Sequence, residues 1–82
     1  MLTTKILIRE VEKLGLVAIV DRGRIQFENS KGHAVACIDV TTMCVLDATY
    51  CFGFRELSGV DRKRLLDLLG KYANTPIEDR DL

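Results

Sequence analysis

Four residues of metal-ligating type are concentrated in the middle of the chain: His33, Cys37, Asp39 and Cys44. If Thr41-Thr42 forms a two-residue turn between two strands, all four side chains lie on the same face of a sheet. However, the sequence has no CxxC or HxxxH pair, and ligands spread along two strands converge poorly on a tetrahedral ion with bonds of about 2.0–2.3 Å. We therefore expect no metal and no cofactor.

A thiol or a desolvated carboxylate is the remaining basis for catalysis. His33 is the only histidine, and its separation from Cys37 along a strand prevents an easy hydrogen bond between them. Asp47 lies in the apolar run Val45-Leu46-Asp47-Ala48, where loss of solvation favours the neutral carboxyl group and suits it to acid–base chemistry. The chain lacks GxGxxG, GxxxxGK[ST], GxSxG and HExxH motifs. A small enzyme that uses Asp47 or a cysteine is therefore only our third hypothesis.

Basic residues gather where the second predicted helix begins. Arg62, Lys63 and Arg64 occupy its first turns, where the helix dipole disfavours cations. Together with Arg55 they form a candidate nucleic-acid site, although the chain as a whole has a formal net charge of zero. A solvated helix face explains the same residues, so nucleic-acid binding is the second hypothesis.

Aromatic residues cluster just before this helix, around Gly53. They are Tyr50, Phe52 and Phe54. When exposed, aromatic side chains dominate protein-binding hot spots and stack on bases. We therefore expect these three to contact a protein partner, unless they belong to the hydrophobic core.

Length and composition predict one globular domain, residues 1–82, because a second core would leave neither half enough apolar surface to bury. The chain is 48% hydrophobic and 29% charged, which is too hydrophobic for a disordered tail. Charged residues interrupt the N-terminal segment, so it lacks the continuous apolar core of a signal peptide. No apolar run is long enough to span a membrane. Three cysteines without a secretion signal indicate a reducing compartment, so we expect a cytoplasmic protein with no membrane contact.

Hydrophobic periodicity and turn residues predict an α+β fold with the order α-β-β-β-β-α. The predicted elements are a helix over 4–14, strands over 16–20, 24–28, 33–40 and 43 to 49 or 50, and a helix from Ser58 to Asn74. The simplest arrangement is an antiparallel meander with both helices packed on one face. We assign no structure to residues 50–54.

The predicted strand over 33–40 is apolar on both faces. Strict alternation places Ala34, Ala36, Ile38 and Val40 on one face, and Val35 and Cys37 on the other. Helices can cover only one face of so small a sheet. The second face is therefore predicted to meet another copy of the protein, giving a homodimer.

The end of the second helix is predicted from proline chemistry. Pro76 has no N–H and disfavours a helical Thr75, so the helix must end near Asn74. Thr75 can then cap a last short turn. Arg80 is expected to pair on the surface with Glu78 or Asp79, with a small effect on stability.

This tail also resembles the YAxTPxExR ending of small uncharacterised proteins carried by phages and mobile elements of Gram-positive bacteria. The matching residues are Tyr72-Ala73-Asn74-Thr75-Pro76-Ile77-Glu78-Asp79-Arg80. The resemblance implies a phage or prophage accessory gene and assigns no site residues. With catalytic motifs missing, our first hypothesis is a non-enzymatic accessory or regulatory protein that binds another protein.

Overall fold

The computed structural model describes residues 2–41 and 52–81. Its elements are helix α1 (Thr4–Glu12), strands β1 (Val17–Asp21), β2 (Arg24–Glu28) and β3 (Ala34–Asp39), helices α2 (Phe52–Arg55) and α3 (Gly59–Ala73), and a 3-10 helix, η1 (Ile77–Asp79). The three strands form an antiparallel sheet in the order β1-β2-β3. The predicted α+β class is confirmed, whereas the predicted strand over 43 to 49 or 50 lies outside the described residues.

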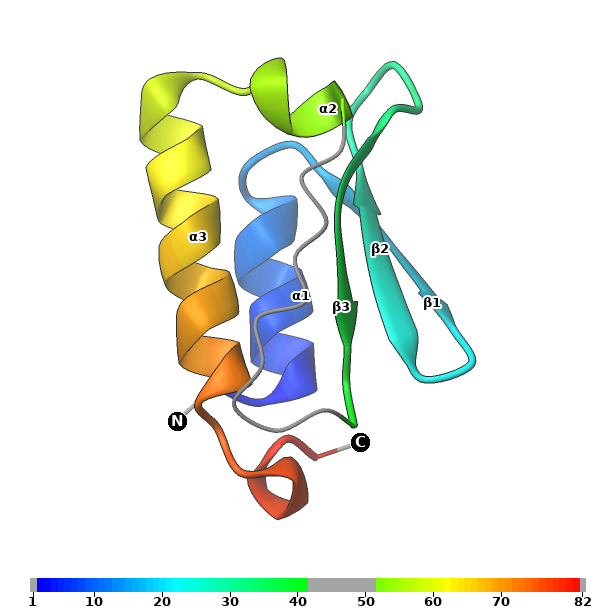
Figure 1. Cartoon of the computed structure of the whole chain (residues 1–82), viewed down its shortest axis with the longest axis vertical. Helices are drawn as coiled ribbons and strands as arrows, with labels where there is room; N and C mark the ends of the chain where they lie inside the picture. Colours follow the sequence, from blue (N-terminus) through cyan, green and yellow to red (C-terminus); the bar gives the residue numbers. More distant parts are fainter. Residues whose placement is uncertain (1, 42–51, 82) are drawn as a thin grey trace.

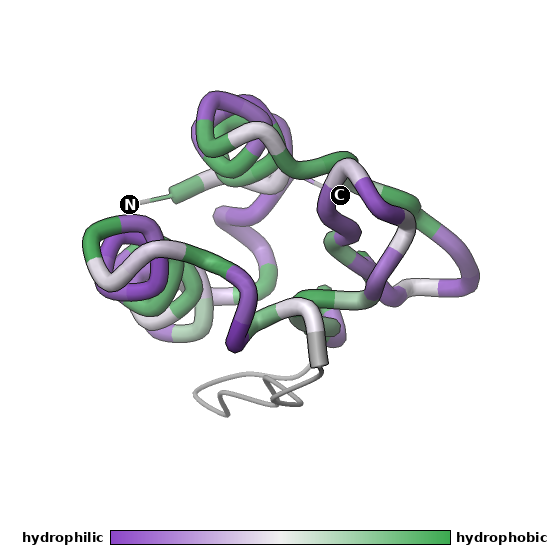
Figure 2. Tube along the Cα trace, turned by 90° about the horizontal axis from the view of Figure 1, so that it is seen from above, coloured by the Kyte–Doolittle hydropathy of each residue, from purple (hydrophilic) through white to green (hydrophobic). Residues whose placement is uncertain are grey.

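The two long helices lie side by side on the same side of the sheet (Figure 1). Viewed from above, both show hydrophobic and hydrophilic residues around each turn, as amphipathic helices do (Figure 2). One buried cluster joins helices and strands, with Leu7 and Val11 from α1, Phe27 from β2, and Leu65 and Leu69 from α3, all fully buried. Among the described residues, no helix has the length and apolar character needed to cross a membrane.

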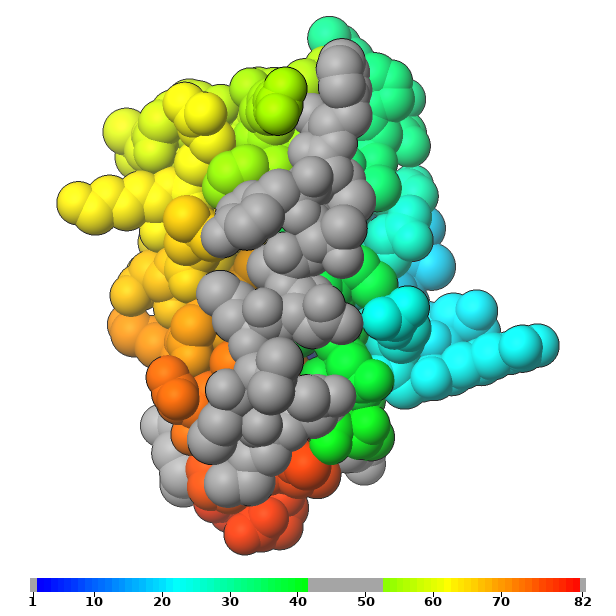
Figure 3. Space-filling model, in the orientation of Figure 1, coloured from blue at the N-terminus to red at the C-terminus, as the bar shows by residue number. Residues whose placement is uncertain are grey.

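The β1–β2 turn is shorter than predicted, since the predicted strands over 16–20 and 24–28 leave residues 21–23 between them. Asp21 pairs with Arg24, so only Arg22 and Gly23 form the turn, both with positive φ (49° and 78°). Positive φ at both residues is typical of two-residue hairpin turns, in which the twist of the turn matches that of the flanking strands. In Figure 3 this hairpin, in cyan, projects from the body of the molecule.

A β-bulge changes the faces of β3. Phe27 pairs with Ala36 and Glu28 pairs with Ala34, so the register shifts between them. Because Phe27 and Glu28 point to opposite faces, Ala34 and Ala36 do so too, and Val35 is fully buried. The predicted placement of Ala34 with Ala36, and of Val35 with Cys37, is therefore wrong, since strict alternation cannot detect a bulge.

The short helix α2 packs against the start of β3. The contact is close because Gly53 lies against the β3 backbone: a Cβ atom added there would lie 2.6 Å from the Ala34 carbonyl oxygen. Only glycine permits this approach without a shift of one segment. The aromatic cluster is thus centred on a backbone-to-backbone contact.

The two ends of the chain meet through the tail. Arg80 is fully buried, and its carbonyl accepts a hydrogen bond from the Thr4 N–H at 2.7 Å. Its guanidinium donates to the carbonyls of Thr75, Val40 and Ala73 at 2.9, 2.8 and 3.2 Å. The predicted surface pairing of Arg80 is therefore wrong: within residues 2–41 and 52–81 its guanidinium meets main-chain acceptors instead of a carboxylate, and these compensate for its burial.

Thr75 also differs from its predicted role. The helix does end before Pro76, and Ser58 caps its start by accepting from the Asp61 N–H at 3.1 Å. However, the Thr75 hydroxyl donates to the Lys71 carbonyl at 2.9 Å and accepts from the Leu2 N–H at 3.1 Å, and η1 has no side-chain cap. The tail residues that carry the resemblance thus make structural contacts.

Candidate functional site

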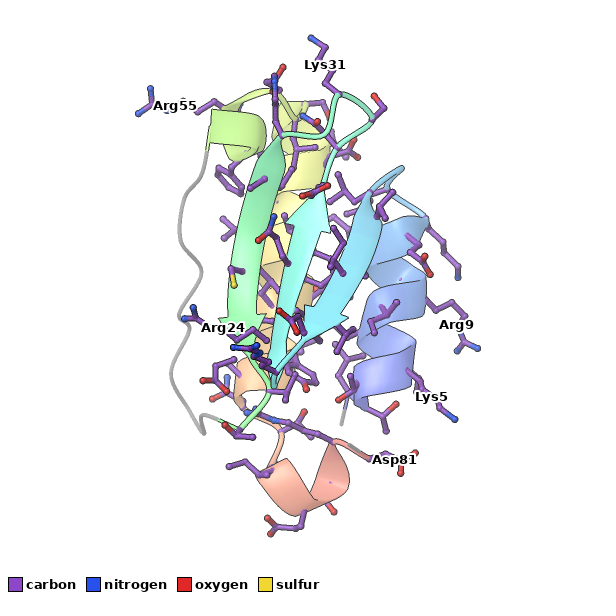
Figure 4. The ribbon with its side chains drawn as sticks, turned by 90° about the vertical axis from the view of Figure 1, so that its right-hand side faces the viewer. Lys5, Arg9, Arg24, Lys31, Arg55 and Asp81 are labelled. Atoms are coloured by element: carbon purple, nitrogen blue, oxygen red, sulfur yellow. The ribbon has the colours of Figure 1, made fainter. Side chains whose placement is uncertain are left out.

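The face of the sheet opposite the helices is the best candidate for an interaction surface. Ile25 and Phe27 point into the core, so alternation turns the residues between them outward. The residues of β1 and β3 that pair with these outward residues of β2 lie on the same face of the sheet. We call this surface the outer sheet face; its residues are Val17, Ile19, Asp21, Arg24, Gln26, Glu28, Ala34, Cys37 and Asp39. Figure 4 views the molecule from this side.

Apolar side chains lie uncovered on this face. Val17 and Ile19 are 54% and 43% exposed, and a shallow hollow of about 210 Å³ lies beside Ile19 and Cys37. Isolated exposed apolar residues are common on protein surfaces. Here, however, Ile19 lines the hollow, and Val17 lies two residues away on the same face of the strand. A partner's side chain could fill such a hollow.

Polar groups at the two ends of the face are ordered. Gln26 donates to a Glu28 carboxylate oxygen at 2.9 Å. At the other end, Asp39 accepts from the Thr41 N–H and hydroxyl at 2.8 and 2.7 Å. Arg24 pairs in register with Asp21 and Asp39 on either side. The face therefore combines an apolar strand with fixed charges at both ends.

Comparison with known proteins gives no match: no family model fits the chain, and no curated protein or solved structure is significantly similar to it.

A second polar cluster surrounds Glu56, just after α2. Its carboxylate is hydrogen-bonded to His33 Nδ1 at 2.5 Å, to Asn29 Nδ2 at 3.1 Å and to Lys31 Nζ at 3.2 Å. The Asn29 side chain also accepts from the Lys31 and His33 N–H groups, both at 3.0 Å. This cluster ties the β2–β3 turn to the start of α3. Sequence reasoning missed Glu56 because its partners lie more than 20 residues away.

The contacts of Glu56 make stability depend on pH. The hydrogen bond from His33, with those from Asn29 and Lys31, lowers the pKa of Glu56 to about 2. A carboxyl group with a lowered folded-state pKa stabilises the fold above its unfolded pKa, about 4.3, and loses that contribution as the pH falls toward 2. We expect Glu56→Gln to lower the denaturation midpoint at about pH 6, with a smaller effect at about pH 2.5.

Glu12→Gln is the matched control, because Glu12 is exposed on α1. Denaturant unfolding of both variants at the two pH values checks the prediction. An equal effect of Glu56→Gln at both values would contradict the assigned role.

The residues of metal-ligating type separate in the structure. His33 contacts Glu56, whereas Cys37 and Asp39 belong to the outer sheet face, and Cys44 lies outside the described residues. In residues 2–41 and 52–81, no three His, Cys, Asp or Glu side chains are grouped to hold a metal ion. Asp47, the carboxylate considered for catalysis, also lies outside that part.

The basic residues are exposed, but they do not form one uniform patch. Arg55, Arg62, Lys63 and Arg64 all face solvent, and Arg55 points away from the body of the molecule in Figure 4. Arg64 lies 3.5 Å from Asp67, which also pairs with Lys71 at 3.2 Å. A carboxylate thus lies within the basic stretch and weakens its attraction for phosphate.

The structure describes only part of the aromatic cluster. Tyr50 and the side chain of Phe52 lie outside the described residues. Phe54 is half-buried and packs against the core. Val17 and Ile19, the large apolar residues exposed on the outer sheet face, were missed because a short β-branched run does not reveal which of its faces is covered.

Proposed function

We propose that this protein is a non-enzymatic interaction module, a phage-type accessory or regulatory protein that acts in the cytoplasm by binding a protein through its outer sheet face. The observation that carries the proposal is the exposure of Val17 and Ile19 on that face, where Ile19 also lines a hollow. Full burial of an exposed Val or Ile side chain contributes about 1.5–3 kcal/mol, and since these two are about half exposed, covering each would contribute roughly half of that before the costs of association.

The distribution of charge supports protein as the partner. The outer sheet face carries acidic Asp21, Glu28 and Asp39 and a single basic residue, Arg24, so it would repel a phosphate backbone. Exposed apolar residues on the edge strand β1 lie beside a polar central strand, and a mixture of apolar and polar surface is usual for a non-obligate protein interface. Tyr50, Phe52 and Phe54 remain proposed as additional contacts with a protein partner.

A tagged pulldown from a bacterial host lysate tests the proposal. We expect the wild-type protein to retain a specific protein through high salt, and Ile19→Lys to reduce its recovery by about tenfold or more. Val60→Lys is the matched control, because Val60 is 78% exposed on α3 and its replacement makes the same chemical change. Equal recovery with both variants would exclude the outer sheet face as the binding surface.

Nucleic-acid binding is the second proposal, favoured by the exposure of Arg55, Arg62 and Lys63. Such binding would weaken steeply as salt rises. It would also be lost in an Arg62→Glu/Lys63→Glu variant while Ile19→Lys retained it. No binding to single or double strands at low salt would remove this alternative.

A further inference from the structure

Strand β1 lies at an edge of the sheet, with β2 as its neighbour in the strand order. Asp21 and Arg24 close the two-residue turn and are therefore hydrogen-bonded to each other. Because successive residues of a strand bond alternately to its two sides, the N–H and C=O groups of Ala18 and Val20 point away from β2. Among the described residues, no main-chain hydrogen bond from an element other than β2 reaches β1. The edge therefore presents main-chain donors and acceptors that another strand could pair with.

Apolar side chains are exposed on both faces of the sheet at this edge. Ile19 points outward and is 43% exposed, whereas Val20 pairs with the buried Ile25, points to the helical side, and is still 59% exposed. Figure 1 shows that β1 diverges from α1 toward the hairpin. A partner packed on one face of the sheet would cover only one of Ile19 and Val20. An added strand would cover both, because its side chains alternate between the same two faces.

The edge also lacks the features that protect edge strands from pairing, which are charged residues, proline and β-bulges. Residues 17–20 read Val-Ala-Ile-Val, and the register shift of the sheet lies between β2 and β3. We infer that β1 is a docking edge, which binds an extended segment of a partner protein as an added strand. This inference depends on the proposed function, because Ile19 belongs to both surfaces.

Charges on the two sides of the edge specify the chemistry of that segment. The outer sheet face carries three acidic residues and one basic residue, so it favours Lys or Arg in the segment's outward row, close to Asp21. On the helical side, the exposed Lys5 and Arg9 of α1 point outward beyond β1 (Figure 4). They disfavour basic residues in the inward row. The occupant is therefore a segment rich in β-branched residues, with Lys or Arg in its outward row only.

Selection from a display library of random peptides of about ten residues tests the inference. Wild-type protein and Val20→Pro are the two targets, and Val20→Thr is the matched control because it keeps both the N–H group and β-branching. Proline at this edge position removes an outward N–H group but no bond to β2, so the fold should persist. Thermal unfolding of each variant checks that it is folded.

We expect wild type to enrich peptides in which apolar residues alternate with Lys or Arg. By fluorescence polarisation, Val20→Pro should bind the most enriched peptide about tenfold or more weaker than wild type, and Val20→Thr within about threefold of wild type. Equal affinities of wild type and Val20→Pro, or a wild type that enriches no peptide, would overturn the inference.

Hydrogen exchange of the wild-type protein gives a readout that needs no proline variant. The amide groups of Ala18 and Val20 should exchange about tenfold or more slowly when the peptide is bound, because both become hydrogen-bonded. Unchanged exchange at both would overturn the inference.

Two other occupants would give distinct results. Peptides that Ile19→Lys loses but Val20→Pro retains would overturn the inference while leaving the proposed function intact, since they bind the outer sheet face alone. Wild-type protein that sediments as a dimer, with Val20→Pro as a monomer, would also overturn it, because a second copy then occupies the edge. The pulldown with Ile19→Lys tests the proposed function separately.

Discussion

Arg80→Met is expected to lower the free energy of unfolding by about 2–4 kcal/mol. The guanidinium provides the donors for carbonyl groups of Thr75, Val40 and Ala73. It also lies over the Tyr72 ring, 4.6 Å from the ring centroid. Methionine fills much of the same volume but donates no hydrogen bond, so three buried acceptors lose their partner.

Arg22→Met is the matched control, because Arg22 is exposed in the hairpin turn, and its replacement should change stability by less than about 0.5 kcal/mol. Arg80→Lys should recover only part of the loss, since an ammonium group cannot reproduce the planar fork of guanidinium donors. Urea is the denaturant, because guanidinium chloride is a salt and would screen the charges that are being compared. Equal midpoints for Arg80→Met and Arg22→Met would show that the buried contacts contribute little.

Gly53→Ala is expected to destabilise the protein by about 1–3 kcal/mol. The added Cβ would lie 2.6 Å from the Ala34 carbonyl oxygen and 3.0 Å from that of His33. Both neighbours are backbone atoms at the start of β3, so they cannot move aside as a flexible side chain would. Either α2 or the strand must shift, which opens the packing around Phe54.

Gly70→Ala is a control for which we expect a change in stability of the opposite sign. Gly70 lies inside α3, and a Cβ added there meets no atom within 4 Å. Because glycine costs a helix interior about 0.5–1 kcal/mol relative to alanine, this variant should be more stable than wild type. Urea unfolding of the two alanine variants checks both signs, and a neutral Gly53→Ala would show that the close approach is absent in solution.

Local patterns predicted those parts of the fold that local chemistry determines. The helix near the N-terminus, the start of the second helix at Ser58 and its end before Pro76 all follow from patterns within a few residues. The β-bulge, the glycine contact of α2 and the burial of Arg80 depend on segments far apart in the chain. Periodicity carries no signal for them, which is why Arg80 was predicted to lie on the surface.

The candidate site was predicted less well than the fold. A second apolar face of the sheet was predicted, with Val35 as one of its residues. The bulge instead turns Val35 into the core. Val17 and Ile19 carry the exposed apolar surface instead. Which side of a β-branched strand is covered depends on where the helices pack, and that information is non-local.

Photo-crosslinking in host cells shows whether the outer sheet face binds another protein. A diazirine-bearing amino acid is placed at Gln26, in the middle of the outer sheet face, and at Lys63 on α3 as the control. We expect protein adducts from Gln26 and none from Lys63. Adducts from Lys63 alone would contradict this expectation and place the binding surface on the helices.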